Sequence, residues 1–175
     1  NIDHGYVHSI DNFEFIDGVF ELVRAAHDNK LKVVVITNQA GIGRGLYSEQ
    51  QFHLLTSWMC KEFIIAGAVI DKVYFSPFHP TEGIGEYKKD DSSRKPNPGM
   101  IFQAQQELDL DLNGSILIGD KGSDIQAGNT AGVGLNILFT QRNTPEIIPY
   151  KYCLITSLLD ALPFINNHIK SRISK

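Results

Sequence analysis

Two short polar runs in this chain directly follow apolar runs, and their residue types could handle a phosphate group. The first run, Thr37, Asn38 and Gln39, comes after the β-branched residues 33–36, and the second begins at Asp120 after another apolar run. Continuous apolar runs of this kind are typical of parallel strands that are buried on both faces. Because ligands bind outside the carboxyl ends of the strands in open α/β sheets, both runs are expected at an active-site edge.

Cationic and carboxylate side chains accompany these runs. Arg44 follows a glycine-punctuated turn, and Arg94 and Lys95 precede a predicted helix start, whose positive dipole end favours an anion. Asp120 and Asp124 offer hard oxygen ligands that suit Mg²⁺. Taken separately, each feature also has a purely structural interpretation. Thr37 could simply be a good strand residue, Arg94 and Lys95 could be a solvated basic pair, and Asp124 could cap a helix. Their order on successive strand ends favours a phosphate site with Mg²⁺.

Composition and missing motifs argue against several other functions. The net charge of −4, without a basic block, argues against nucleic acid as a partner. No apolar run is long enough to span a bilayer, and the first residues do not resemble a signal peptide, so we expect a cytoplasmic protein with no membrane partner. The glycines at 41, 43 and 45 lack the dinucleotide-binding spacing, and there is neither a P-loop nor a G-x-S-x-G motif. Cys60 and Cys153 are expected to be reduced.

Hydrophobic periodicity predicts helices that alternate with strands. Helices are expected over residues 17–30, 48–67, 97–108, 123–132 and 158–169, and strands over 31–37, 69–75, 116–119, 134–139 and 152–155. Asp17, Ser48 and Asn97 are the expected N-caps, and Ser48 with Gln51 has the capping-box spacing. The alternation predicts an α/β fold: a doubly wound, Rossmann-like parallel sheet with helices on both faces, in a single domain without a separate cap domain.

Four stretches resemble the haloacid dehalogenase superfamily and, within it, the D-glycero-D-manno-heptose 1,7-bisphosphate phosphatase family. They are DHGYVHSIDNFEFIDGV (residues 3–19), TNQAGIGRG (37–45), RKPNPGM (94–100) and GDKGSD (119–124). The first stretch separates the chain from the related histidinol-phosphate phosphatases. The resemblance covers nearly the whole chain and implies Mg²⁺-dependent removal of the 7-phosphate of the heptose bisphosphate. In the family this reaction supplies activated heptose for lipopolysaccharide or other surface polysaccharide.

The resemblance also implies roles for individual residues. Thr37 would hydrogen-bond the transferring phosphoryl group, and Lys95 would balance its charge. Asp120 and the backbone of Lys121 would hold Mg²⁺, and Asp124 would support the site without being a ligand. The residues implied to contact the sugar or its distal phosphate are Asp3, His4, Gly5, Tyr6, Asn38, Gln39, Ala40, Arg44 and Arg94.

The sequence departs from the family pattern at its start. The family's first motif, an apolar strand that ends in D-x-D-G-T, supplies the nucleophilic aspartate, which forms an aspartyl-phosphate, and the acid/base aspartate two residues on. Asp3 cannot replace them, because no strand leads into it. We expect that a strand and turn of about 10 to 20 residues precede Asn1 and pair between strands 31–37 and 116–119. Without that motif the 175-residue chain is expected to be inactive.

A second departure lies in the long loop of residues 76–93. Many members of the family clip this loop with zinc through a C-x-H pair and a C-x-C pair. The positions that match these ligands hold Ser76, Phe78, Asp91 and Ser93. His79 and Asp90 are too few for a tetrahedral site. We therefore expect no structural zinc and a loop that is held by its own contacts.

Two alternatives stay open at this point. One is a phosphatase for histidinol phosphate or another small sugar phosphate, which the relative turnover of the substrates would reveal. The other is a catalytically inactive relic that binds sugar phosphates, which a D-x-D strand encoded upstream would exclude. We expect a monomer whose partner is a small phosphorylated sugar.

Overall fold

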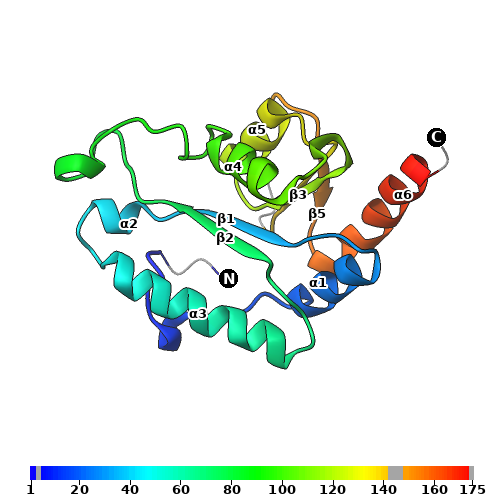
Figure 1. Cartoon of the computed structure of the whole chain (residues 1–175), viewed down its shortest axis with the longest axis horizontal. Coiled ribbons are helices and arrows are strands. Elements are labelled where there is room, and N and C mark those ends of the chain that lie inside the picture. The colour runs from blue at the N-terminus through cyan, green and yellow to red at the C-terminus, as the bar shows by residue number, and fades with distance from the viewer. Residues whose placement is uncertain (3–4, 142–147, 174–175) are drawn as a thin grey trace. The chain divides into compact units, whose positions relative to one another are not determined.

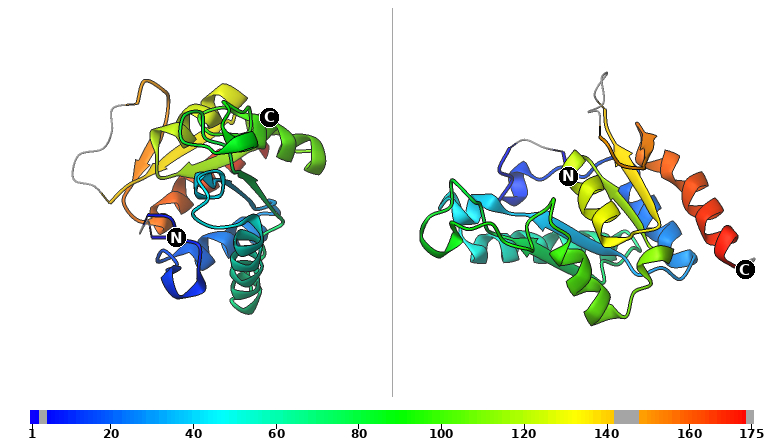
Figure 2. Two further views of the ribbon diagram at one scale, coloured as in Figure 1. Left: turned by 90° about the vertical axis from the view of Figure 1, so that its left-hand side faces the viewer. Right: turned by 90° about the horizontal axis from the view of Figure 1, so that it is seen from above.

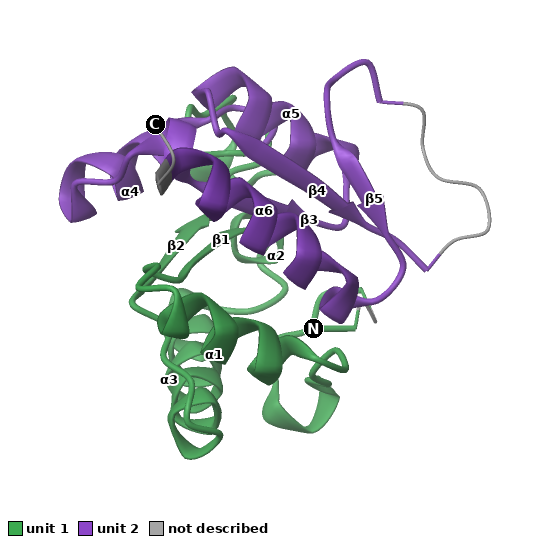
Figure 3. Cartoon of the chain, turned by 90° about the vertical axis from the view of Figure 1, so that its right-hand side faces the viewer, with its two compact units in different colours: residues 1–94 green, residues 95–175 purple. Residues whose placement is uncertain are grey.

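Every strand pairing in the described part of the chain is parallel, and helices alternate with the strands (Figure 1). The computed structural model describes residues 1–2, 5–141 and 148–173. The chain divides into two compact units, residues 1–94 and residues 95–175, which Figure 3 colours separately. The predicted α/β class with parallel strands is therefore confirmed.

Unit 1 is built on a pair of strands, β1 (Val34–Asn38) and β2 (Lys72–Ser76), in which Thr37 lies opposite Phe75. The α3 helix runs along this pair (Figure 1 and Figure 2). The helices of the unit are α1 (Val19–Asp28), α2 (Ala40–Gly43) and α3 (Glu49–Ile65), and its 3-10 turns are η1 (Ile10–Asn12) and η2 (Gly85–Tyr87).

Two apolar clusters hold the helices of unit 1 in place. Val23 of α1 and Phe63 of α3 pack together with the fully buried Ala68. The second cluster joins Ile42 of α2, Phe52 of α3 and Tyr47, and it packs against Val73 and Phe75 of β2. This second cluster fixes the segment that follows β1, where the predicted phosphate-binding residues lie.

Unit 2 has a sheet of three strands in the order β3 (Ile116–Gly119), β4 (Leu135–Phe139) and β5 (Cys153–Ile155) (Figure 3). Its helices are α4 (Gly99–Leu108), α5 (Gly122–Ala131) and α6 (Ala161–Ile173), with the turns η3 (Leu112–Gly114) and η4 (Leu158–Asp160). The α5 helix packs on β3 and β4, and α6 contacts η3. Across the residues that are described, no helix has both the length and the apolar character needed to cross a membrane.

The structure corrects two of the three predicted N-caps. The α1 helix begins after Gly18, not Asp17, because the chain enters it with φ 83°, a conformation that favours glycine. Pro98, not Asn97, is the N-cap of α4. The capping box at Ser48 is confirmed: the Gln51 N–H donates to Ser48 Oγ at 3.1 Å, and the Ser48 N–H donates to Gln51 Oε1 at 2.8 Å.

Two further expectations are correct in position but differ in detail from the structure. The glycine-punctuated turn after β1 is a one-turn helix, α2, because glycines at 41 and 43 let neighbouring groups approach it closely. The helix expected over residues 158–169 starts as η4 and continues as α6. The described strands form two sheets, β1–β2 and β3–β4–β5. A further strand between strands 31–37 and 116–119, and the single domain, stay predictions.

Close packing between α5 and β4 makes Gly128 a sensitive position. A Cβ at residue 128 would lie 2.0 Å from Oδ1 of Asn136, a side chain that is 5% exposed and donates to the Val133 carbonyl at 3.1 Å. At a solvent-exposed helix position, replacing glycine by alanine stabilises the helix by up to about 1 kcal/mol. Here the close contact with Asn136 makes the same replacement destabilising. We expect Gly128→Ala to lower the free energy of unfolding by about 1 to 3 kcal/mol, measured by urea denaturation.

The matched control for this prediction is Thr130→Ala on the exposed side of the same helix. It should change the free energy of unfolding by no more than about 0.5 kcal/mol. A Gly128→Ala variant as stable as this control would contradict the packing described for α5 and β4.

Candidate functional site

In unit 1 a chain of hydrogen bonds follows the carboxyl end of β1. Gln39 Nε2 donates to Thr37 Oγ1 at 3.1 Å, and the Tyr47 hydroxyl donates to Gln39 Oε1 at 2.5 Å. The Gln39 N–H donates to the Ser76 carbonyl at 2.7 Å, which ties this segment to the end of β2. Burial, together with a smaller electrostatic effect of Tyr6, raises the pKa of Tyr47 to about 12, so its hydroxyl is protonated at neutral pH.

The structure also brings Tyr6 and Arg44 together, two residues predicted to contact the substrate. Arg44 Nη1 hydrogen-bonds the Tyr6 hydroxyl, and the guanidinium carbon lies 5.2 Å from the centroid of the Tyr6 ring. The same Nη1 lies 3.0 Å from Glu82 Oε2. Arg44 is therefore held at the C-cap of α2 by partners from both flanking segments. Asp3 and His4 lie outside the described residues.

The long loop after β2 is closed by hydrogen bonds among the positions that match the family's zinc ligands. The Ser93 hydroxyl lies 2.7 Å from Asp91 Oδ1 and 2.9 Å from the hydroxyl of Ser76, which is fully buried. Arg94 Nη1 donates to the Phe78 carbonyl at 3.0 Å. The expectation that the loop is held by its own contacts agrees with these bonds. The absence of a structural zinc stays a prediction.

Hydrogen bonding also changes the acidity of this loop. Burial acts to raise the pKa of Asp91, but hydrogen bonds from Ser93 and the ion pair with Lys89 outweigh it, so the pKa lies below its usual value. A lowered folded-state pKa contributes stability that is present above the unfolded pKa of about 3.9 and is lost as the pH falls through the folded pKa. The loop is therefore expected to be most stable near neutral pH.

We expect Ser93→Ala to lower the free energy of unfolding by about 1 to 2 kcal/mol at pH 7, because it leaves the buried Ser76 hydroxyl without its partner. The loss should shrink below about pH 4, where the Asp91 carboxyl of the unfolded chain is protonated. Urea denaturation at both pH values measures it. The neighbouring Ser92 is exposed, so Ser92→Ala is the matched control. A loss of the same size at both pH values would contradict the role of Asp91.

In unit 2 a buried ion pair lies beside the carboxyl end of β3. Lys95 Nζ is 2.7 Å from Asp124 Oδ1, and the two side chains are 13% and 7% exposed. Asp124 Oδ2 accepts the N–H of Lys121 at 3.0 Å, which caps α5. Gly119 makes room for this carboxylate, since a Cβ there would lie 2.3 Å from the Asp124 Cβ. Asp124 thus orients Lys95 and begins α5 at the same time.

The donor set at this strand end suits Mg²⁺. Both Asp124 oxygens are engaged, whereas Asp120 is exposed directly after β3. The Lys121 carbonyl already accepts the N–H of Asp124 at 3.0 Å, so Asp120 is the stronger candidate ligand. Among the described residues no group of three or more histidine, cysteine or acidic side chains could enclose a metal ion. One carboxylate with water and phosphate oxygens is a donor set that Mg²⁺ accepts.

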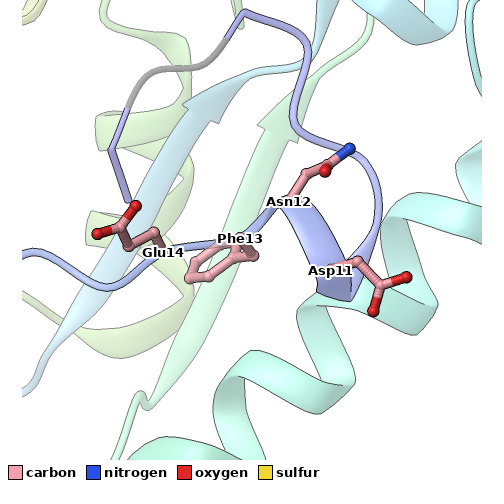
Figure 4. A pocket seen from close by; sticks show the side chains of 4 residues that line it. All are labelled: Asp11, Asn12, Phe13 and Glu14. Carbon is pink, nitrogen blue, oxygen red and sulfur yellow. The ribbon is translucent and has the colours of Figure 1, made fainter.

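Unit 1 also has a surface pocket that none of these residues lines. It is lined by Asp11, Asn12, Phe13 and Glu14, which come from one continuous segment at η1 (Figure 4). Three of these four side chains are exposed, and no predicted site residue lines the pocket. We assign it no part in the chemistry.

Structural comparison defines the class of protein. A family model described as HAD-hydrolase-like matches residues 92–145. A HAD-like phosphatase from Mesorhizobium loti superposes with a TM-score of 0.85 at 27% sequence identity, over 98% of this chain and 81% of that one. D,D-heptose 1,7-bisphosphate phosphatase from B. bronchiseptica, complexed with magnesium and phosphate, gives 0.75 at 24% identity, over 93% and 89%. This second likeness concerns the fold alone. Together these matches define a HAD-like hydrolase fold.

Sequence relatives define the family more narrowly. D-glycero-alpha-D-manno-heptose-1,7-bisphosphate 7-phosphatase of Burkholderia mallei is 50% identical over 165 residues, which are 94% of this chain and 87% of that protein. D-glycero-beta-D-manno-heptose-1,7-bisphosphate 7-phosphatase of Yersinia pestis is 45% identical over 138 residues, or 79% and 73%. The chain therefore belongs to the D-glycero-D-manno-heptose-1,7-bisphosphate 7-phosphatase family.

Sequence reasoning missed Tyr47 and Glu82, which hold Gln39 and Arg44 in place. Tyr47 had one local signal: Gly41 lies six residues earlier, and a Cβ there would lie 2.1 Å from Tyr47 Cε1. Because glycine has no Cβ, an aromatic ring six residues later can pack directly on the backbone of the first turn after the strand. Glu82 carried no signal, because its partner is 38 positions away, as the residue numbers 44 and 82 show.

Proposed function

We propose that this protein is a phosphatase that hydrolyses the 7-phosphate of D-glycero-D-manno-heptose 1,7-bisphosphate. One observation carries the proposal: half of the aligned residues are identical to a named 7-phosphatase over 94% of this chain. The buried cation beside a strand-end carboxylate in unit 2 supports it, because phosphoryl transfer depends mainly on positioning and on charge neutralisation.

The proposed roles are those that the family resemblance implies, and the contacts within each unit support them. Thr37 donates its hydroxyl hydrogen to an oxygen of the transferring phosphoryl group. Lys95 balances the negative charge of that group, and Asp124 holds the ammonium in place at 2.7 Å. None of the 175 residues is proposed as the nucleophile or the general acid, so each activity assay below uses the complete gene product.

Mg²⁺ is the proposed cofactor, held by the Asp120 carboxylate with a smaller contribution from the Lys121 backbone. When bound, Mg²⁺ neutralises charge on the phosphate oxygens. The proposed role of Asp120 is to fix the position of that charge at the end of β3.

A second anchor is proposed for the remainder of the substrate. Arg44 lies against Tyr6 and within 3.0 Å of Glu82, so its guanidinium is oriented before a ligand binds. Arg44 and Arg94 are proposed to bind the sugar or its distal phosphate, along with Asn38, Gln39, Ala40 and the segment of residues 3–6. Arginine forks suit such contacts, because they match phosphate oxygens in pairs.

The setting of the reaction is also a proposal. We propose a cytoplasmic monomer that works in the supply of activated heptose for lipopolysaccharide or other surface polysaccharide. The proposed binding partner is the phosphorylated sugar substrate. Nucleic acid and membrane are not proposed as partners.

A substrate panel tests the proposed function. Both anomers of the heptose bisphosphate and histidinol phosphate are compared by phosphate release, with Mg²⁺ and with excess EDTA. We expect kcat/KM for one heptose anomer to exceed that for histidinol phosphate by at least about 10²-fold, because a site built for several polar groups discriminates strongly against ligands that lack them. Equal or greater turnover of histidinol phosphate would overturn the proposed substrate, and undiminished activity in EDTA would overturn the proposed cofactor.

A further inference from the structure

Tyr47 is linked to Thr37, whose hydroxyl is proposed to contact the phosphoryl group, through the side chain of Gln39. Its own hydroxyl donates to Gln39 Oε1 at 2.5 Å, and Gln39 Nε2 donates to Thr37 Oγ1 at 3.1 Å. Thr37 is the last residue but one of β1, and Gln39 is the N-cap of α2. The three side chains therefore form a continuous line from the second apolar cluster of unit 1 to the end of the strand.

The donors and acceptors in this line can be arranged in only one fully satisfied way. In the described part of the chain, Gln39 Oε1 is the sole acceptor that the Tyr47 hydroxyl contacts. Because Tyr47 is only 7% exposed, an unpaired hydroxyl there is costly, and the amide must turn its oxygen toward Tyr47. Gln39 then presents an N–H to Thr37 Oγ1. That oxygen becomes an acceptor, and its hydrogen must point elsewhere.

Close packing holds the Tyr47 ring in this position. Its ring stacks on His8, with the ring centroids 5.1 Å apart and the planes 4° from parallel. The ring also lies against α2 at Gly41, where an added Cβ would lie 2.1 Å from Tyr47 Cε1. Ile42 and Phe52 complete the contacts of the ring within its cluster. The hydroxyl is thus presented to Gln39 by a rigid ring.

We propose that Tyr47 is a positioning residue: by fixing the orientation of the Gln39 amide, it keeps the Thr37 hydroxyl hydrogen available for a phosphoryl oxygen. If the Tyr47 hydroxyl is removed, the amide can turn over, and Gln39 Oε1 then accepts the Thr37 hydrogen. Thr37 loses its free donor although every side chain around it is unchanged. This inference rests on the proposed function, since it takes Thr37 to contact the phosphoryl group.

The primary test is Tyr47→Phe in the complete gene product. We expect kcat/KM to fall by about 10- to 150-fold, the range that follows the loss of one hydrogen bond to a charged group. The matched control is Tyr87→Phe. Tyr87 packs against the same cluster and donates to Glu49 Oε1 at 3.1 Å, but it does not contact Gln39 or Thr37. The control should lose no more than about 2-fold.

A double-mutant cycle separates positioning from general damage to the structure. In a Thr37→Val background the hydroxyl is already gone, so adding Tyr47→Phe should lower kcat/KM no further. Gln39→Glu should reproduce the Tyr47→Phe loss, because a carboxylate accepts the Thr37 hydrogen in either orientation. A full, multiplicative loss in the Thr37→Val background would overturn the proposal.

Each variant is assayed on the heptose bisphosphate and on p-nitrophenyl phosphate, and the dissociation constant of orthovanadate is measured by calorimetry. Hydrolysis of p-nitrophenyl phosphate without hydrolysis of the heptose bisphosphate would refute the proposed substrate but would leave the cycle intact. The same coupling should appear in orthovanadate binding, which needs no turnover. Binding that is weakened equally in both Thr37 backgrounds would overturn the proposed role of Tyr47.

Discussion

Replacing Lys95 by methionine in the complete gene product is expected to lower kcat for the heptose bisphosphate by at least about 10³-fold. The ammonium is the cation that balances the phosphoryl charge in the proposed reaction, and it lies 2.7 Å from Asp124 Oδ1 in surroundings where it is 13% exposed. Water screens such a charge poorly, so its removal has a large effect on a transition state that gathers negative charge. Methionine keeps a similar length and flexibility without the charge.

The same substitution also leaves Asp124 buried without its partner, and a buried carboxylate in that state destabilises a fold by about 3 to 5 kcal/mol. The double variant Lys95→Met/Asp124→Asn removes both charges and separates the two effects. We expect it to recover most of the free energy of unfolding, measured by urea denaturation, while kcat stays low. Recovery of kcat together with stability would mean that Lys95 serves the fold and not the reaction.

Asp120→Asn is expected to have the second large effect, a loss of about 10² in Mg²⁺ affinity and of about 10³ in kcat. The side chain is exposed directly after β3, and asparagine preserves its shape while removing its charge. Because the side chain is exposed, thermal stability without metal should not change. Calorimetric titration with Mg²⁺ and steady-state rates at saturating Mg²⁺ measure the two losses separately.

The control for this variant is Asp109→Asn, in the same unit. Asp109 is exposed and has φ 52°, a left-handed conformation that asparagine tolerates. The Asp109→Asn variant loses the same charge as Asp120→Asn, but at a position that is not a strand end. The Mg²⁺ affinity of this variant should therefore equal that of the unsubstituted protein. Unchanged Mg²⁺ binding in Asp120→Asn would show that the metal is held elsewhere.

Local sequence signals predicted those parts of the fold whose causes are local. Strand β3 ends at Gly119 as expected, because an apolar run is followed at once by a carboxylate. Gly132 ends α5 with φ 83°, as its lack of a side chain permits. The Ser48 capping box needs only residues three positions apart. In each case the interacting groups lie within one turn of each other.

The parts that were not predicted depend on contacts made by folding. The α2 turn packs against the Tyr47 ring at Gly41, and nothing in a glycine-rich run indicates which ring will lie there. The sequence indicates a capping and supporting role for Asp124 but not its ion pair with Lys95, which joins positions 95 and 124. Such distant pairs follow from the arrangement of α4, β3 and α5, and not from any pattern within one element.

The measurement that tests the central claim most directly is ³¹P NMR of D-glycero-D-manno-heptose 1,7-bisphosphate during incubation with the complete gene product and Mg²⁺. The signal of the 7-phosphate monoester should disappear as inorganic phosphate grows, while the signal of the anomeric 1-phosphate persists without loss. Because the two phosphates are bonded to different kinds of carbon, their signals are distinct. The spectrum therefore shows which phosphate is cleaved, and the product need not be purified. Loss of the anomeric signal first, or an unchanged spectrum under conditions in which histidinol phosphate is hydrolysed, would contradict the account.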